Sequence, residues 1–249
     1  MAEIGGKIRL FVAADLCPGA VISLEPPQAH YLFKVMRRGA GDTLAVFNGR
    51  DGEWRAEIVE TGRRTGRLEL RAPTAPQRQP PDLWLLFAPI KKARTDFIVE
   101  KATELGAARI QPIFTRRTNT ARLNLDRLRA HAIEAAEQCG ETHVPKIAAP
   151  EPLAALLDGW DPARRLVFAD ETREAPPMLT ALAISQDPAA PGPWAILTGP
   201  EGGFEAEEAA RLRACPFVVP AALGPRVLRA DTAAVAALAL WQAALGDWR

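Results

Sequence analysis

The stretch WAILTGPEGGFEAEEAARLRAC, residues 194–215, runs from an apolar segment through a glycine-rich turn into an acidic, helix-forming segment. Gly199, Gly202 and Gly203 permit positive φ and a close approach of the backbone to a ligand, and Pro200 stiffens the turn. The turn is neither a GxGxxG motif nor a phosphate loop, which needs Lys-Ser/Thr after its glycines. Nearby carboxylates would also repel a phosphate: Glu201, Glu205, Glu207 and Glu208. The stretch therefore predicts a strand, a loop suited to a neutral or cationic ligand, and a helix, although such a turn can also be purely structural.

A second loop of the same form, LGPRVLRADTA at residues 223–233, lies between an apolar run and an expected helix. Asp231 or Thr232 can cap that helix. Arg226 and Arg229 have no such local role in a loop otherwise built from Gly, Pro and apolar residues. They are therefore candidates for function, with ordinary surface charge as the alternative.

Apolar and helix-forming segments alternate through residues 82–249, which indicates an α/β domain with a largely parallel sheet. The expected strands are 83–89, 109–114, 166–169, 195–197 and 217–219, and the expected helices are 94–105, 126–139, 205–214 and 232–245. Ligands bind beyond the carboxyl ends of the strands in such sheets. Three loops qualify: 170–174, 198–204 and 221–231.

Residues 1–72 have a different pattern. Short β-prone runs alternate with Gly-Asp, Asn-Gly and Asp-Gly turns, at 7–13, 43–47, 53–60 and 66–71. Only 27–37 is expected to be helical, so this part predicts a small β-barrel with one helix. Four prolines within residues 73–81 favour an extended linker between the two domains.

The charge is uneven along the chain. Residues 1–81 hold twelve Lys and Arg against nine Asp and Glu, and residues 91–131 hold ten against four. Residues 132–249 hold nine against sixteen, so a polyanion is expected to bind the first half. Three widely spaced cysteines argue against disulfides and a zinc site and fit the reducing cytoplasm. We expect no signal peptide and no membrane span.

The two glycine- and arginine-bearing loops, residues 197–204 and 223–233, resemble the paired signatures of the trefoil-knotted (SPOUT) methyltransferases. Within that superfamily the chain is most similar to the RsmE family, the 16S ribosomal RNA uracil-N3 methyltransferases. The resemblance covers nearly the whole chain and includes the segments 30–37 and 101–106, Lys91, Lys92, and Glu137-Gln138 followed by Pro145. Two residues depart from the family pattern. Glu141 replaces an expected basic residue, and Asp231 replaces a common Glu.

This resemblance implies a PUA-like β-barrel over 1–72 and, after the Pro-rich linker at 73–81, a trefoil-knotted methyltransferase domain over 82–249. It also implies a cytoplasmic homodimer that uses S-adenosylmethionine (SAM) without a metal. The implied substrate is 16S ribosomal RNA in the assembled small subunit, modified at uracil 1498. The residues implied to hold the donor are Leu197, Thr198, Gly199, Pro200, Gly202, Gly203, Leu223, Gly224, Val227 and Leu228.

Methylation of uracil N3 requires loss of a proton whose pKa is about 9, which costs roughly 3 kcal/mol at neutral pH. Arg226 or Arg229 could stabilise the negative charge that develops on the uracil oxygens. Glu201 or Asp231 could accept the proton. We expect an arginine to be the essential group.

A track of basic residues is expected to bind the RNA, although each residue alone could be an ordinary surface charge. It comprises Arg9, Arg37 and Arg38 on the barrel and Lys91, Lys92, Arg94, Arg116, Arg117 and Arg122 beyond the linker. Two alternatives stay open. One is a transfer RNA methyltransferase of the same superfamily, and the other is a non-catalytic RNA-binding factor for ribosome assembly.

Overall fold

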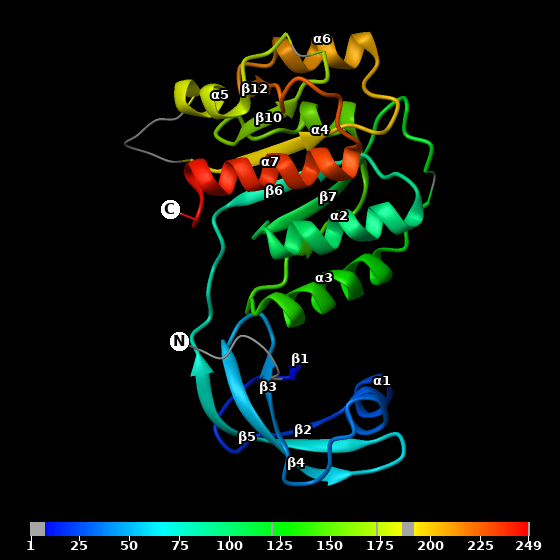
Figure 1. The fold of residues 1–249 in the computed structure, drawn as a ribbon, viewed down its shortest axis with the longest axis vertical. Coiled ribbons are helices and arrows are strands. Elements are labelled where there is room, and N and C mark those ends of the chain that lie inside the picture. The colour runs from blue at the N-terminus through cyan, green and yellow to red at the C-terminus, as the bar shows by residue number, and fades with distance from the viewer. Residues whose placement is uncertain (1–7, 121, 173, 186–191, 249) are drawn as a thin grey trace. The chain divides into compact units, whose positions relative to one another are not determined.

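The computed structural model describes residues 8–120, 122–172, 174–185 and 192–248, which form two compact units. The first unit comprises the chain up to Gln79 together with Ala136–His143, and the second comprises Pro80–Ala135 and the chain from Val144 onward. Figure 1 traces both units in ribbon form. Each unit has its own apolar core, and each is described by itself below.

The first unit is built on a five-stranded sheet with the order β1-β3-β4-β5-β2. Its strands are β1 Arg9–Phe11, β2 Val21–Ser23, β3 Thr43–Phe47, β4 Glu53–Thr61 and β5 Gly66–Ala75. β1 runs parallel to β3, and the other pairs are antiparallel. β2 was not predicted, because three residues are too few to show an alternating pattern.

The expected helix at 27–37 is present in two parts, an α-helical turn α1 at Pro26–His30 and a π-helical turn η1 at Tyr31–Val35. The helical hydrogen bonding ends with Met36 donating to the carbonyl of Tyr31. Arg37 follows with a φ of 54°, which reverses the chain after η1. The prediction was therefore right about the helix and wrong about its regularity and its end.

Alternation along the strands explains the core of this unit. Trp54, Ala56 and Ile58 of β4 are buried, while the residues between them are more exposed. Ile58 pairs with Leu68 of β5, and Val46 of β3 pairs with Trp54. One face of the sheet therefore presents a continuous apolar surface, and each large side chain buried there contributes about 1.5–3 kcal/mol.

β5 extends to Ala75, three residues into the stretch that was expected to be a linker. Pro73 has no backbone N–H to donate and is tolerated in strands mainly at irregularities. The pairing with β4 is irregular here, with register shifts at Glu53/Trp54 and Arg55/Ala56. β2 pairs with β5 from Arg67 to Glu69, and beyond these pairs the Gly19 amide donates to the Leu70 carbonyl and the Leu70 amide donates to the Ala20 carbonyl.

The second unit is built on parallel strands in the order β12-β10-β11-β6-β7-β8, with β9 beside β7. The strands are β6 Leu83–Phe87, β7 Arg109–Phe114, β8 Lys146–Ile147, β9 Glu151–Pro152, β10 Arg165–Ala169, β11 Trp194–Thr198 and β12 Val218–Ala221. The helices are α2 Lys92–Glu104, α3 Leu125–Cys139, α4 Leu153–Asp158, α5 Met178–Ser185, α6 Ala206–Ala214 and α7 Ala230–Leu245. The α/β architecture with a parallel sheet is thus confirmed. α4, α5 and the two shortest strands were not predicted.

Helices cover both faces of this sheet, so its central strands are apolar throughout. Leu85 and Ile196 face one core, which includes residues of α2, α3, α5 and α7. Leu86 and Leu197 face the other core, with residues of α4 and α6. The order of the strands brings the carboxyl ends of β10, β11 and β12 together at one edge, where the three expected loops begin. The trefoil knot implied by the family resemblance stays a prediction.

An ion pair between a buried arginine and an exposed aspartate joins the residues that precede two strands. The Arg164 side chain is 8% exposed, and its Nη1 and Nη2 donate to the two carboxylate oxygens of Asp82 at 2.9 and 2.8 Å. The guanidinium also lies 3.7 Å from the ring centre of Trp84. This bidentate pair fastens the chain before β10 to the chain before β6.

In the described part of the chain, the helices are all too short or too polar to cross a bilayer.

Candidate active site

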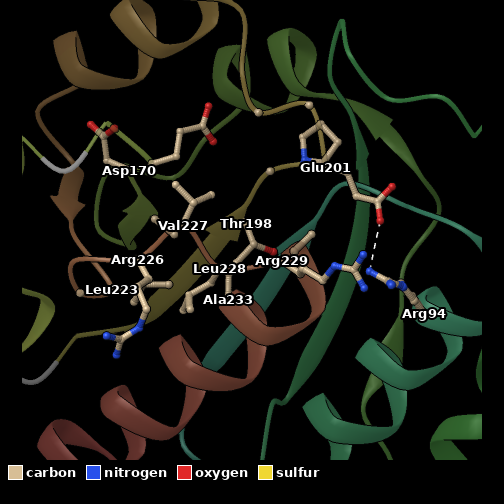
Figure 2. Close-up of a pocket in the computed structure, with 18 of the residues that line it drawn as sticks. Arg94, Asp170, Thr198, Glu201, Leu223, Arg226, Val227, Leu228, Arg229 and Ala233 are labelled. Atoms are coloured by element: carbon tan, nitrogen blue, oxygen red, sulfur yellow. Dashed lines mark hydrogen bonds and ion pairs between the residues drawn. The ribbon is translucent and has the colours of Figure 1, made fainter.

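A cavity of about 650 Å³ lies at the carboxyl ends of β10, β11 and β12 (Figure 2). This volume is typical of small-molecule sites, which hold roughly 300–1,000 Å³. All three loops predicted from the strand ends contribute to it. Its lining comprises Lys91, Arg94, 169–171, 198–203, Leu223, Gly224, 226–230 and Ala233.

Two of the three glycines of the first loop are required by the packing of the protein itself. A Cβ on Gly199 would lie 2.6 Å from the ring of Phe204, which is 6% exposed. Gly203 has a φ of +69°, and a Cβ there would collide with the carboxylate of Glu171. A Cβ on Gly202 would meet only Arg117, at 3.6 Å. Positive φ was therefore correctly expected at Gly203, whereas Gly199 is needed to make room for an aromatic ring.

Carboxylates of the 170–174 loop hold the cavity wall together. Glu171 Oε1 accepts a hydrogen bond from the Phe204 amide at 3.1 Å. Asp170 has a side chain only 2% exposed, and its Oδ2 accepts from Arg213 Nε and Nη2 at 3.0 and 2.7 Å. Oδ1 accepts from the amide and the hydroxyl of Thr172. Asp170 therefore holds this loop to Arg213 of α6, and Glu171 holds it to Phe204, which precedes α6.

Burial by itself would raise the pKa of Asp170, but the hydrogen bonds from Arg213 and Thr172 outweigh it, so the pKa lies below its ordinary value. Asp170 is therefore a charged structural anchor, not a proton acceptor. The sequence indicated this loop by its position after a strand, but nothing in the pattern distinguished Asp170 from other acids.

Nine of the ten residues predicted to hold a donor line the cavity. Leu197 does not, because it is fully buried in the core on the α4 and α6 side of the sheet. The Thr198 hydroxyl is buried without a hydrogen-bond partner among the described residues. Val227 is 73% exposed at the cavity wall. An unpaired hydroxyl, close-lying backbone groups and exposed apolar side chains fit a ligand with both polar and apolar parts.

Arg226 and Arg229 both line the cavity and are both exposed, but they point in different directions. Figure 2 shows Arg229 directed towards the side of the cavity where Arg94 and Glu201 lie, while Arg226 points away from them. The geometry therefore separates two arginines that the sequence left equivalent. Arg229 is the one that shares a region of the cavity with a candidate proton acceptor.

Arg94, predicted to contact RNA, instead joins the two candidate acids. Its Nη1 lies 3.2 Å from Glu201 Oε1 and 3.9 Å from Asp231 Oδ2. Arg94 is 27% exposed and Asp231 17%, whereas Glu201 is 46% exposed. Asp231 Oδ1 also accepts from the amide of Thr232 at 2.9 Å. Glu201 and Asp231 thus lie on the same guanidinium, although 30 residues separate them in sequence.

The helix that follows this loop begins earlier than expected. The N-cap of α7 is Arg229, with extended φ and ψ of −66° and 154°, and its carbonyl accepts from the Ala233 amide at 2.8 Å. No side chain caps the helix in the structure. The prediction that Asp231 or Thr232 caps it was wrong, because both residues lie inside the first turn.

Some residues of the predicted RNA track form ion pairs with acidic residues of the protein, and others do not. In the first unit the Arg9 side chain is 9% exposed, and it pairs with Glu53 at 2.7 Å and donates to the carbonyls of Ala136 and Glu141. This gives Arg9 a structural role. Lys91 lines the cavity beside Arg94. The members that are exposed without an ion pair to another described residue are Arg37, Arg38, Lys91, Lys92 and Arg122.

Arg116 and Arg117 are neutralised by the acidic start of α6. Arg116 Nη1 lies 2.6 Å from Glu207, and Arg117 Nε lies 2.7 Å from Glu205. The hydrogen bond and charge of Glu205 raise the pKa of Arg117, and the same pair lowers the pKa of Glu205. Arg117 Nη1 also donates to the Gly202 carbonyl at 2.8 Å, so Arg117 joins the 198–204 loop to the start of α6.

Glu141, which departs from the family pattern, folds back on its own backbone in the first unit. Its Oε1 accepts from the amide of Thr142 at 2.7 Å. The carboxylate therefore stabilises the turn after α3, where the pattern led us to expect a basic group.

Comparisons with known proteins agree with this architecture. A family model described as an RNA methyltransferase domain matches residues 77–242, and one described as an RNA methyltransferase PUA domain matches residues 24–70. Ribosomal RNA small subunit methyltransferase E of Synechocystis sp. is 34% identical over 233 residues, which cover 93% of this chain and 76% of that protein. The protein of the same name from Rickettsia conorii is 29% identical and covers 93% of each chain.

Solved structures show the same fold. A Legionella pneumophila protein in complex with SAM has a TM-score of 0.86 and 28% identity, covering 98% of this chain and 100% of that one. Ribosomal RNA small subunit methyltransferase E from Neisseria gonorrhoeae, bound to SAM, has a TM-score of 0.86 with the same coverage and 24% identity, so it supports the fold alone. With a PUA-like unit, a parallel α/β unit and family models matching most of its length, this chain belongs to the RNA methyltransferase family that includes ribosomal RNA small subunit methyltransferase E, the RsmE family.

Proposed function

We propose that this protein uses SAM to methylate N3 of uracil 1498 in 16S ribosomal RNA. The observation that carries the proposal is the cavity at the ends of β10, β11 and β12, whose two principal loops are the glycine- and arginine-bearing segments on which the resemblance rests. The relatives named for methylation of small-subunit ribosomal RNA align with nearly the whole chain, including these loops.

The residues of the cavity fit SAM. Thr198 offers a buried hydroxyl without a partner in the described chain, and the backbone of Gly199 and Gly202 lies open to the cavity. Leu223 and Leu228 supply apolar surface for the adenine ring of SAM. The carboxylate of Glu201 would favour the positively charged sulfur of SAM. When bound, SAM supplies a methyl group on a positively charged sulfur. The other donor candidates are Pro200, Gly203, Gly224 and Val227, and Leu197 would contribute only through its backbone.

The protein must stabilise the uracil anion and remove one proton. A guanidinium near the uracil oxygens stabilises negative charge as N3 loses its proton. We assign this role to Arg229, because it lies on the same side of the cavity as Glu201. Arg226, which points away, is the second candidate. Positioning and charge together have to offset the roughly 3 kcal/mol of deprotonation at neutral pH.

Glu201 and Asp231 are the candidates for the proton acceptor, and Arg94 holds both on one guanidinium. Glu201 is the more exposed of the two, so an RNA base can reach it from outside. We therefore assign proton removal to Glu201 and the positioning of Arg94 to Asp231.

The setting in which this reaction takes place follows from the same family. We propose that the protein acts as a homodimer in the cytoplasm, on 16S ribosomal RNA within the assembled small subunit. A trefoil knot in the second unit belongs to the same proposal.

The experiment that tests the function has two parts. Calorimetry with SAM should give saturable binding of one donor per chain, and no binding at millimolar donor would leave only a non-catalytic role. Incubation of small-subunit particles and, separately, of transfer RNA with labelled donor should then label only the particles. Mass analysis of the digested RNA should show 3-methyluridine. A 2′-O-methyl nucleotide or a methylguanine would identify a different methyltransferase.

A further inference from the structure

Glu201, the proposed proton acceptor, lies in a tight turn of the 198–204 loop (Figure 2). The turn spans Pro200 to Gly203 and is closed by the Gly203 amide, which donates to the Pro200 carbonyl at 3.0 Å. The loop contains three glycines, which give its backbone a wide choice of conformations. Contacts from other segments restrict that choice and so decide where the carboxylate lies.

One such contact comes from Arg117, which follows β7. Its Nη1 donates to the Gly202 carbonyl at 2.8 Å, and its Nε donates to Glu205 Oε1 at 2.7 Å. Gly202 lies inside the turn, and Glu205 is the N-cap of α6. One guanidinium therefore holds both ends of the segment that leads from the turn into the helix. Its planar shape suits this task, because its N–H groups point in fixed directions.

A second contact comes from Glu171, in the loop after β10. Its Oε1 accepts from the Phe204 amide at 3.1 Å, and its carboxylate occupies the space that a Cβ on Gly203 would need. The backbone from Gly202 to Phe204 is thus held by a cation at its carbonyl end and by an anion at its amide end. Charge-assisted hydrogen bonds of this kind are stronger than neutral ones.

Arg117 is itself fixed by its surroundings. It lies in a turn in which the Thr118 amide donates to the Thr115 carbonyl at 3.1 Å and the Thr115 amide donates to the Thr118 hydroxyl at 2.9 Å. The amide of the preceding residue, Arg116, donates to Glu208 of α6 at 2.9 Å. A side chain whose backbone is already ordered has less conformational entropy to lose when it holds a neighbouring loop.

The sequence led us to expect that Arg117 binds RNA. Its side chain is 46% exposed, but two of its three nitrogens already donate to the protein. The carboxylate of Glu205 also compensates its charge, so a phosphate would have to compete with that carboxylate. These contacts favour a role within the protein.

We propose that Arg117 is a positioning residue for methyl transfer, which holds the turn that carries Glu201 by donating to the Gly202 carbonyl. Glu171 holds the end of the same turn. Arg117 thereby places two groups at once, the loop backbone that we propose to bind SAM and the carboxylate that we propose to accept the proton. The inference rests on the proposed function for these two roles, but not for the identity of the methylated base.

The test compares Arg117→Gln with the matched control Arg211→Gln. The two side chains are similarly exposed, at 46% and 41%, and each forms an ion pair. Arg211 pairs with Asp158 of α4 and lies outside the cavity lining. Each variant is measured by hydrogen exchange without donor, by calorimetry with SAM, and by kinetics on small-subunit particles at saturating SAM. The melting temperature checks folding.

Arg117→Gln should speed hydrogen exchange of the 199–204 amides in the absence of any donor or RNA. It should raise the Kd for SAM by about 5-fold to about 10-fold, with one donor still bound per chain, because a charge-assisted but partly exposed hydrogen bond is lost. At saturating SAM, kcat should fall because the freed turn carries Glu201, while KM for the particle stays the same.

Two further variants sharpen the result. Glu171→Gln should change exchange, the Kd for SAM and kcat in the same direction, because a neutral amide oxygen accepts more weakly than a carboxylate. Arg117→Lys keeps the charge without the planar fork and should give a Kd for SAM between those of the natural protein and Arg117→Gln. Arg211→Gln should behave like the natural protein in every measurement.

The proposal is overturned if Arg117→Gln exchanges its loop amides and binds SAM as Arg211→Gln does. It is also overturned if the variant raises KM for the particle and leaves the Kd for SAM unchanged, because Arg117 would then bind RNA. A lower melting temperature with fewer donor sites per chain at an unchanged Kd would show a role in folding alone, and would overturn it as well. Methylation of another base would refute the proposed function and leave the exchange and Kd results standing, so the two failures are distinguishable.

Discussion

Replacing Gly199 with alanine tests whether the 198–204 loop, which we propose to bind SAM, has the shape seen in the structure. The new methyl group would lie 2.6, 3.0 and 3.2 Å from three atoms of the Phe204 ring. That ring is 6% exposed and packs edge-on against Phe168 with ring centres 5.1 Å apart, and the Phe204 amide is held by Glu171. Because the ring and the backbone are both held in place, neither can move without losing contacts. Forcing a methyl group into such a filled space destabilises the loop by about 1–3 kcal/mol.

This cost falls on the loop that we propose to bind SAM. If the loop must recover its natural shape to bind the donor, Gly199→Ala should raise the Kd for SAM by about 5-fold to about 150-fold. Calorimetry measures this directly. Gly202→Ala is the matched comparison in the same loop, because its Cβ would meet only Arg117 at an ordinary 3.6 Å, and its effect should be clearly smaller.

A double-variant cycle identifies the cause. Phe204→Leu removes the ring edge that the methyl group meets, so Gly199→Ala and Phe204→Leu should cost less together than the sum of their separate effects. Normal SAM binding by Gly199→Ala, or equal losses for Gly199→Ala and Gly202→Ala, would refute the reasoning. Strictly additive losses in the cycle would show that the ring is not the obstacle.

Three further predictions follow from named contacts. Arg229→Ala should lower kcat by at least 10-fold with the Kd for SAM little changed, and Arg226→Ala should lower kcat less. If a single-turnover assay showed the larger loss of rate for Arg226→Ala, the roles of the two arginines would be exchanged. Asp82→Asn should lower the free energy of unfolding in urea by about 1–3 kcal/mol, because it leaves the buried Arg164 guanidinium without its charged partner, and an unchanged midpoint would contradict this. The pKa of Asp170 in the folded protein lies below its ordinary value of 3.8, so its stabilising effect is present above that pH and is lost as the pH falls through the lower folded value. Urea unfolding of Asp170→Asn should therefore lack the part of the acid dependence below about pH 3.8 that the natural protein shows, and identical curves would contradict the assignment.

The parallel sheet was predictable because its strands are buried on both faces and its helices are long. Leu85, Ile196 and Val167 lie in apolar runs that mark their strands directly, and the edge where the loops gather follows from parallel strand order. Short elements such as β2 and α4 were not predicted, because three to six residues carry too little periodicity.

The site was predictable in its loops and not in its charge pairs. The sequence suggested ten donor candidates, and nine of them line the cavity, because glycine, proline and loop position carry information about the backbone. It could not show that Arg94 joins Glu201 to Asp231, because these residues are distant in sequence. The sequence also does not distinguish a basic residue that forms an ion pair within the protein from one that binds RNA. For the same reason it assigned Arg9 to the RNA track, although the structure places that side chain in a buried ion pair with Glu53.

Gly199 and Gly203 show that glycines in a loop can serve the packing of the protein itself. A glycine-rich loop suggested room for a ligand, but Gly199 makes room for the Phe204 ring and Gly203 for the Glu171 carboxylate. Only a three-dimensional arrangement can distinguish space kept for a ligand from space kept for a neighbouring side chain.

The most direct test of the central claim is to map the methylated nucleotide in purified small-subunit particles after incubation with this protein and labelled SAM. Particles from a strain that lacks the modification provide the substrate, and Arg229→Ala, incubated for the same short time, provides the slowed control. We expect a single methyl group on N3 of uracil 1498, formed at least 10-fold more slowly by the variant. A methyl group on a different base or on a ribose, or no product from a protein that binds SAM, would contradict it.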